Sequence, residues 1–219
     1  MSTPEVLEEA PEWDPRDGAG SDALKRKQII DGAARVFLSQ GFNGASMGEI
    51  ARVAGVSKGT LYVYFENKEQ LFEACIEEKR RTHAQILQEF DRSQPIEQEL
   101  RRYGESLARF TSDPQLIMAM RTVIGIAEQM PEMGSRYYDK GPGWGIRRFA
   151  EFLDKRVASG VLAISDTVLA AAQFTDLCQS TLIRPLLFGC SFTAEEREAR
   201  IKAVVASAVE VFLKAYRAD

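Results

Sequence analysis

Residues 46–68 read SMGEIARVAGVSKGTLYVYFENK, a sequence that predicts two short helices joined by a tight turn. Ser46 is the expected N-cap of the first helix, and Glu49, three residues later, would complete a capping box. Gly55 should end this helix, because glycine adopts the left-handed conformation without steric cost. Ser57 then caps the second helix. This order of elements is the helix-turn-helix plan.

The second helix of this motif has the side chains that reading DNA requires. A recognition helix needs short or planar hydrogen-bonding groups near its N-terminus and a positive charge for phosphate. We expect Leu61 and Phe65 to face inward, whereas Gly59 allows close approach to a DNA backbone. The expected outward side chains are Lys58, Thr60, Tyr62 and Tyr64. The alternative is a purely structural or protein-binding helical hairpin, which would not require this turn and these four side chains.

The run from Ile50 to Leu71 has the pattern Ile-Ala-x-x-Ala-Gly-Val-Ser-Lys-Gly-Thr-Leu-Tyr-x-Tyr-Phe-x-x-Lys-Glu-x-Leu, which resembles the signature of the TetR family of transcriptional regulators. The resemblance implies an all-α homodimer that binds operator DNA and releases it when a small molecule enters the C-terminal domain. Residues 121–189, with Met-Pro-Glu-Met-Gly-x-x-Tyr-Tyr and a Gly-Pro-Gly interruption, resemble the C-terminal domain of the AefR-like subgroup.

Phosphate contacts are expected on either side of the motif, and the resemblance favours the one that precedes it. Lys25 belongs to a basic triplet at the start of the preceding helix, which could otherwise be a solvated helix end. Lys68 begins the following long helix and is the favoured additional phosphate ligand. The full set of expected DNA-contacting residues is Lys25, Ser46, Ser57, Lys58, Gly59, Thr60, Tyr62, Tyr64 and Lys68.

Charge is distributed unevenly along the 219 residues. The chain has a formal net charge of −4, but residues 1–20 carry −5, residues 21–70 carry +2 and residues 71–219 carry −1. The candidate DNA-binding segment is therefore the net-positive part, and phosphate contacts need local positive charge. Residues 1–20 combine acidic residues with proline and glycine and should be disordered. This tail is either inert or competes with DNA for the basic surface.

The hydrophobic pattern predicts helices throughout the rest of the chain, with no alternating strand pattern. We expect a helix-turn-helix domain at 21–66 and a helical domain for ligand binding and dimerisation at 67–219. The first helix should span about Ser21–Gln40, and a long helix should run from Asn67 to about Asp91. Further helices are expected at 96–110, from 113 up to the Pro131–Gly134 interruption, up to Gly141, at 144–157, from Ser165 to about Phe188, and from a Thr193 capping box onward.

The last two of these helices are apolar over a wide arc, which predicts burial on both sides. One side should face the domain core and the other a second copy of the chain. The candidate dimer residues are Leu182, Leu186, Val205, Val209 and Phe212, although core packing explains each nearly as well. A pocket for an apolar or aromatic effector could be lined by Phe110, Met118, Met120, Trp144, Phe149, Phe174 and Cys178, for which ordinary core packing is again the alternative.

Cysteine content indicates a reducing, cytoplasmic environment, since the three cysteines have no paired spacing and no signal peptide is evident. A second way to regulate the protein would be oxidation of Cys178, or a protein partner in place of a ligand. The absence of an eighteen-residue apolar run argues against a membrane span. No glycine-rich phosphate loop or metal-ligand cluster is present, and there is one histidine. We therefore expect no enzyme activity, cofactor or metal.

Overall fold

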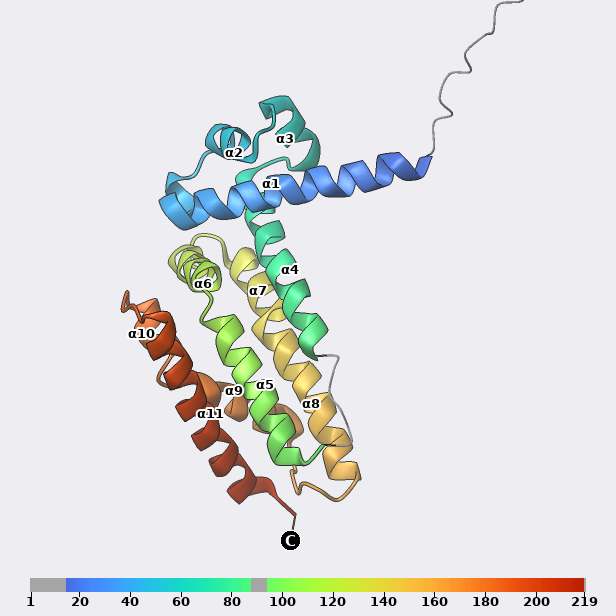
Figure 1. Cartoon of the computed structure of the whole chain (residues 1–219), viewed down its shortest axis with the longest axis vertical. Coiled ribbons are helices and arrows are strands. Elements are labelled where there is room, and N and C mark those ends of the chain that lie inside the picture. Colours follow the sequence, from blue (N-terminus) through green and yellow to red (C-terminus); the bar gives the residue numbers. More distant parts are fainter. Residues whose placement is uncertain (1–14, 88–93, 219) are drawn as a thin grey trace, which may run out of the picture.

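The computed structural model describes residues 15–87 and 94–218, which form eleven helices (Figure 1). They are α1 (Pro15–Gly44), α2 (Met47–Ala54), α3 (Lys58–Tyr64), α4 (Lys68–Leu87), α5 (Ile96–Thr111), α6 (Pro114–Ile126), α7 (Pro131–Lys140), α8 (Pro142–Ala158), α9 (Thr167–Gln179), α10 (Ile183–Leu187) and α11 (Ala194–Tyr216). The all-α prediction is confirmed. Helix α1 lies across one end of the molecule, with α2 and α3 on its outer side and the remaining helices on its inner side (Figure 1).

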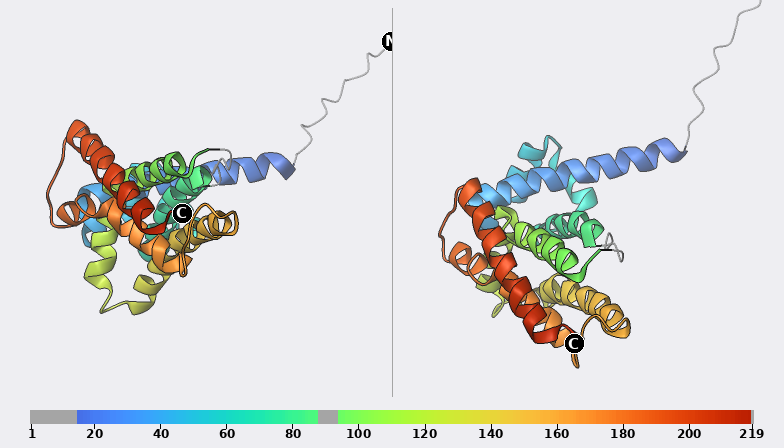
Figure 2. Two further views of the ribbon diagram at one scale, coloured as in Figure 1. Left: turned by 90° about the horizontal axis from the view of Figure 1, so that it is seen from below. Right: turned by 60° about the horizontal axis from the view of Figure 1, so that its bottom comes forward.

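Helix α1 begins earlier than the sequence suggested. A disordered tail was expected up to residue 20, but the helix starts at Pro15, where proline suits a first helical turn. Residues 1–14 of the expected tail lie outside the described residues. Gly41 has a non-helical backbone, with φ +70° and ψ 173°, so the regular part of α1 ends where it was predicted to end. The N-terminal part of α1 projects beyond the other helices (Figure 2).

A first buried cluster joins α1–α4 to α6 and α7. Phe37, Phe42 and Phe72 pack ring against ring at its centre, with centroids 5.1–5.9 Å apart. The cluster also contains Ile29, Ile50, Leu61, Phe65 and Leu71, together with Ala119, Val123 and Met133 from α6 and α7. Two C-terminal helices therefore complete the core under the helix-turn-helix. The domain boundary at residues 66/67 stays a prediction, because side chains on both sides of it share this core.

A second buried cluster fills the space between α5, α8, α9 and α11. Tyr103, Phe149 and Phe174 form its centre, with Tyr103 and Phe149 stacked at 4.1 Å between centroids. Phe212 on α11 meets Phe174 edge-on at 5.1 Å. Aromatic pairs in such arrangements add about 0.5–1.5 kcal/mol each beyond the area they bury. This column of rings links the four helices into one bundle.

One predicted helix is divided in the structure, and the expected end of another lies outside the described residues. The single helix expected from Ser165 to Phe188 is two helices, because α9 ends at Gln179 and α10 covers Ile183–Leu187. Pro185 explains the break, since it cannot donate a hydrogen bond to the carbonyl of Thr181 and its ring clashes with that carbonyl. Helix α4 is described as far as Leu87, and its expected end near Asp91 lies outside the described residues.

The capping box predicted at Thr193 is confirmed, with hydrogen bonds from Glu196 N to the Thr193 hydroxyl and from Thr193 N to the Glu196 carboxylate. In the described parts of the chain, no helix is both long enough and apolar enough to cross a membrane.

Candidate nucleic-acid interface

Local capping defines the turn between α2 and α3 as the sequence predicted. The Ser46 hydroxyl accepts a hydrogen bond from Glu49 N, and Gly55 ends α2 with φ +68° and ψ 37°. The Ser57 hydroxyl accepts a hydrogen bond from Thr60 N at 3.0 Å and lies 2.8 Å from the Thr60 hydroxyl. Each cap satisfies a free backbone N–H at a helix start. Ser46 and Ser57 are exposed at these positions.

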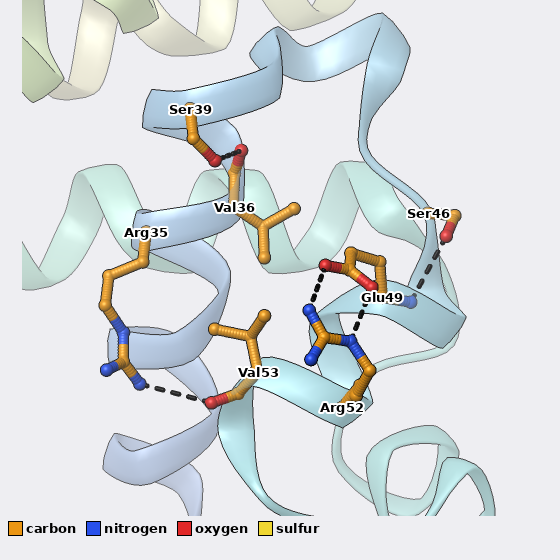
Figure 3. A network of polar contacts seen from close by, with 7 residues as sticks. All are labelled: Arg35, Val36, Ser39, Ser46, Glu49, Arg52 and Val53. Atoms are coloured by element: carbon orange, nitrogen blue, oxygen red, sulfur yellow. Dashed lines mark hydrogen bonds and ion pairs between the residues drawn. The ribbon is translucent and has the colours of Figure 1, made fainter.

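The complete capping box predicted for α2 is wrong. The Glu49 carboxylate turns away from the Ser46 backbone and accepts two hydrogen bonds from Arg52, at 2.7 and 2.9 Å (Figure 3). These hydrogen bonds hold the pKa of Glu49 below its usual value. A bidentate guanidinium one turn away competes better for the carboxylate than a single backbone N–H does. Arg35 of α1 donates to the Val53 carbonyl of α2, which ties these two helices together (Figure 3).

Helix α3 faces outward with a mixed polar and apolar surface. Leu61 is fully buried and Phe65 is 4% exposed, so the predicted inner face is confirmed. Tyr62 is 52% exposed, and Lys58 and Gly59 are exposed as well. The Lys58 side chain passes over Gly48 of α2, where a Cβ atom would lie 2.9 Å from its Cε. A tyrosine and a lysine thus stand free on the outer side of α3.

Tyr64 and Lys25 are held by neighbours within the protein. The Tyr64 hydroxyl donates to the Asp22 carboxylate at 2.5 Å, which links the end of α3 to the start of α1. The Lys25 ammonium donates to Gln28 at 3.1 Å. Both side chains are half-buried, as is Thr60. Their contacts with DNA stay predictions, and Tyr64 has the additional role of fastening α3 to α1.

Lys68 has a structural role that the sequence did not suggest. Its ammonium donates to the carbonyls of Phe42 and Ala45, at 2.8 and 3.3 Å, and lies 4.4 Å from the centroid of the Phe42 ring. These carbonyls belong to the turn that leads from α1 into α2. Lys68 therefore holds the entry of the helix-turn-helix against α4. Its predicted phosphate contact would have to use the remaining N–H of the ammonium.

A Lys68→Met variant separates these two roles. We expect the free energy of unfolding to fall by about 1–3 kcal/mol, because two carbonyls lose a charged donor. Chemical denaturation measures this loss. The dependence of operator affinity on salt then tests the phosphate contact, since each lost contact reduces the slope of log K against log salt by about 0.9. If the slope of log K against log salt is unchanged, Lys68 has a structural role alone. If the free energy of unfolding is unchanged, the hydrogen bonds from Lys68 to Phe42 and Ala45 do not contribute to stability.

The structure adds residues to this surface that sequence reasoning missed. Val63 is 82% exposed on α3, next to Tyr62, where an apolar group can meet a thymine methyl. Gln28 donates to the Ala54 carbonyl at 2.7 Å and so caps the end of α2. Gly32 lies so close to Ala54 that a Cβ atom would come within 2.6 Å of the Ala54 Cβ. The sequence could have indicated Val63, because it is an apolar residue next to Tyr62 on the predicted second helix. The contacts of Gln28 and Gly32 with Ala54 depend on the tertiary fold and could not be predicted from the sequence.

Within residues 15–87 and 94–218, the seven residues predicted to line one effector pocket are divided between the two buried clusters and the surface. Phe149, Phe174 and Cys178 lie in the second cluster with exposures of 0–1%. Met118 packs against the first cluster and Met120 against the second. Phe110 lines a wide cleft between α1, α4 and α5, and Trp144 is half-buried on α8. Phe149 and Phe174 pack against Tyr103 and against each other, with ring centroids 4.1–6.2 Å apart, and a pocket shared by the seven residues stays a prediction.

Four of the five predicted dimer residues face the protein's own core. Leu182, Val205, Val209 and Phe212 are at most 2% exposed within the single chain. Leu186 is half-buried, and its carbonyl accepts a hydrogen bond from Arg121. The outer face of α11 has instead a row of exposed, mostly small residues four apart: Ala203, Ser207, Val211 and Ala215. The large apolar side chains of α11 are needed by the core, so a partner would meet the small ones.

The cysteines carry free thiols, and two of the three are shielded. Cys178 is fully buried against Gly104, and burial raises the pKa of its thiol to about 12. Burial likewise raises the pKa of the Cys75 thiol to about 12, and Cys75 donates to the Ile30 carbonyl. Because the thiolate is the form that is oxidised, this environment does not favour regulation through Cys178.

Two family descriptions match this chain. Residues 29–75 match the family described as bacterial regulatory proteins of the tetR family. Residues 98–218 match the C-terminal domain of AefR-like transcriptional repressors. The first match covers the helix-turn-helix with the second half of α1 and the start of α4, and the second covers most of α5 and all of α6–α11.

Individual relatives agree with these matches. A fatty acid metabolism regulator protein of Bacillus subtilis is 42% identical over 55 residues, which are 25% of this chain and 28% of that protein. The regulator AcrR of Shigella flexneri is 47% identical over 47 residues, 22% of each chain. These matches thus span about a quarter of the relatives' length.

Solved structures match over nearly the whole chain. A TetR-family regulator from Mesorhizobium loti has a TM-score of 0.80 and 27% identity, covering 89% of this chain and 98% of its own. The flavonoid-responsive regulator FrrA has a TM-score of 0.69 and 32% identity, with the same coverage.

Proposed function

The chain belongs to the TetR family of bacterial transcriptional regulators, with an AefR-like C-terminal domain, and on this basis we propose that it is a homodimeric repressor that binds operator DNA and is released by a small molecule. Such a protein works on chromosomal DNA, which implies a cytoplasmic location. It needs no catalytic machinery, because binding alone blocks or permits transcription.

The observation that carries this proposal is the free outer surface of α3. Tyr62 and Val63 are 52% and 82% exposed on a short helix that serine caps at its N-terminus, with Lys58 exposed in the first turn. Single exposed apolar side chains are common on protein surfaces, but here two of them adjoin an exposed lysine on one short helix, and this combination favours contact with a partner. Together with the lysine, they match the groups that read base edges and hold phosphates in a major groove.

Dimerisation supports the reading of a near-palindromic operator. Two-fold symmetry would place two copies of α3 one or more DNA turns apart. The exposed row on α11 and the adjoining face of α9 are the surfaces we propose for the dimer. A cleft of about 670 Å³ lies between these helices and α10, bordered by Leu177, Leu187 and Val211. Matching side chains of a second copy would cover it.

An apolar or aromatic effector remains the proposed inducer. FrrA, which is described as flavonoid-responsive, supports an aromatic ligand by its 32% identity over most of both chains. The ligand must favour one relative arrangement of the two helix-turn-helix domains of the dimer over the other. A ligand that bound both arrangements with equal affinity would not shift the equilibrium between them. Helix α6 is suited to transmit this preference, since Ile117 lies in the second cluster and Ala119 in the first.

Fluorescence anisotropy with DNA from upstream of the protein's own gene tests the proposal. We expect tight binding that weakens steeply as salt increases, since each phosphate contact contributes about −0.9 to the slope of log K against log salt. A duplex of scrambled sequence is the matched control and should bind at least about a thousandfold more weakly. Equal affinity for both duplexes, with and without small aromatic compounds, would refute an operator-binding function at this site.

A further inference from the structure

A third cleft lies where the helix-turn-helix meets the C-terminal helices. It has a volume of about 360 Å³ and receives residues from α1, the end of α3, α4, α6 and α7. None of the seven residues expected to line an effector pocket borders it. Its volume falls within the range of about 300–1,000 Å³ that is usual for small-molecule sites. The floor is apolar, formed by Phe65, Val123 and Met133, each at most 6% exposed.

The edge of this cleft is cationic. Arg26 of α1 and Lys140 of α7 are both exposed there, and neither has a carboxylate partner among the described residues. The Arg26 guanidinium rests 5.2 Å from the centroid of the Phe65 ring. Arg136 adds a third positive charge but is paired with Glu73 at 3.0 Å, and Glu77 contributes a second carboxylate to the lining. The lining therefore carries a net charge of +1.

One polar group points to a specific kind of ligand. Tyr137 of α7 is half-buried in the wall of the cleft, and its hydroxyl has no hydrogen-bond partner in the described part of the chain. Burial raises the pKa of this hydroxyl to about 12, so it remains a neutral donor at physiological pH. The hydroxyl oxygen is not itself fully buried, so water can accept its hydrogen bond, and a ligand in the cleft would take the place of that water.

We propose that this cleft binds a small amphipathic anion, whose apolar body packs on Val123 and Met133 and whose carboxylate meets the cationic edge formed by Arg26 and Lys140. The Tyr137 hydroxyl donates to an oxygen of the same ligand. The apolar floor explains why a free inorganic anion would bind poorly. The two cations without carboxylate partners explain why a neutral compound of the same shape binds less well.

A ligand in this cleft would affect DNA binding through residues that directly adjoin α3. Arg26 belongs to α1 and Lys140 to α7, so one carboxylate would join the reading head to the C-terminal helices. The same cleft is bordered by Tyr64 and Phe65, directly at the end of α3. This consequence rests on the proposed function, whereas ligand binding itself does not.

Isothermal titration calorimetry of the full chain tests the site, with 2-naphthoate as the probe and 2-naphthamide as its neutral counterpart. We expect the carboxylate to bind about tenfold more tightly than the amide. Decanoate and decanamide form a second pair that distinguishes an aromatic from an aliphatic ligand. Equal affinity for the acid and the amide in both pairs would overturn the proposal, as would a lack of binding by all four.

Variants locate the binding within the cleft. Tyr137→Phe and Lys140→Gln should each weaken naphthoate binding about fivefold, because each removes one exposed or half-buried polar contact. Tyr138→Phe alters the neighbouring tyrosine, which is 55% exposed outside the cleft, and Lys155→Gln alters an exposed lysine of α8. These two controls should bind as the wild type does. Equal losses in the controls and in the cleft variants would contradict the assigned site.

A substitution that fills the cleft tests the proposed binding site without removing a charge. Ala74→Leu enlarges a side chain that lines the cleft and should abolish naphthoate binding, while thermal unfolding shows whether the fold survives. If the Ala74→Leu variant does not fold, the Tyr137→Phe and Lys140→Gln variants test the binding site on their own. Repeating the titration with operator bound measures the link to DNA. Binding without any such link would leave the site intact and remove only its regulatory role.

Discussion

A Tyr62→Ala variant is expected to bind operator at least about 30-fold more weakly than the wild type, with unchanged thermal unfolding. Tyr62 is 52% exposed on α3 and contributes nothing to the buried cluster beneath it. A good base contact provides about 1–3 kcal/mol of discrimination. In a symmetric dimer the loss occurs in both half-sites, so about 2–6 kcal/mol would be lost in total. Anisotropy titration at fixed salt measures the change.

A second tyrosine of the same exposure provides the control. Tyr138 on α7 is 55% exposed and lies in another part of the molecule, so Tyr138→Ala should leave operator affinity unchanged. Lys58→Ala serves to distinguish base contact from phosphate contact. It should weaken binding to operator and to scrambled DNA alike, and reduce the salt slope by about 0.9 for each half-site. Undiminished operator binding by Tyr62→Ala would show that α3 does not read the bases.

A Val211→Arg variant is expected to be monomeric at about 10 μM and to lose operator affinity by more than about a hundredfold. Val211 is 49% exposed at the centre of the row on α11. In a two-fold interface each position meets a symmetry-related patch, so the substitution would bury two like charges without partners. An unpaired buried charge costs about 3–5 kcal/mol, enough to dissociate a dimer. Monomeric half-sites then bind DNA separately, with a large loss of affinity.

Light scattering coupled to size-exclusion chromatography measures the mass of this variant. Ile124→Arg is the matched control, because Ile124 is an apolar residue of α6 that is 65% exposed and does not border the cleft between α9, α10 and α11. It should remain dimeric. A dimer that persists in Val211→Arg would assign the interface to another surface, and a monomer in both variants would indicate general destabilisation.

Local sequence signals predicted the helix-turn-helix well. Ser46, Gly55 and Ser57 each act within a few residues of their own position, through a cap or a left-handed turn, and the structure confirms all three. The same short range explains the confirmed capping box at Thr193. The Glu49 prediction was wrong because Arg52, only three residues further on, offers the carboxylate a better partner.

Longer-range contacts account for what the local pattern could not predict. The pattern of α11 shows that it is apolar, but it does not say which side chains the protein's own core requires. Val205 and Phe212 belong to that core, and the surface left for a partner is made of smaller residues. Phe149 and Phe174 likewise pack on each other in a tilted arrangement, with ring centroids 5.3 Å apart, and the sequence pattern does not reveal this contact. The phosphate contact of Lys68 stays a prediction, but its structural role was missed because nothing in the sequence reveals that the carbonyls of Phe42 and Ala45 lie beside it.

The shared first cluster limits how this protein can be re-engineered as a biosensor. Ala119, Val123 and Met133, from α6 and α7, complete the core beneath the reading head. A chimera that joined residues 1–66 to the sensing half of another regulator would replace these three side chains with unmatched ones. There are therefore two ways to give this chain a new operator specificity. A chimera can exchange a segment that includes all the side chains of the first cluster, or substitutions can be limited to the outward residues of α3. Substitutions limited to α3 leave the contacts between the C-terminal helices and the helix-turn-helix unchanged.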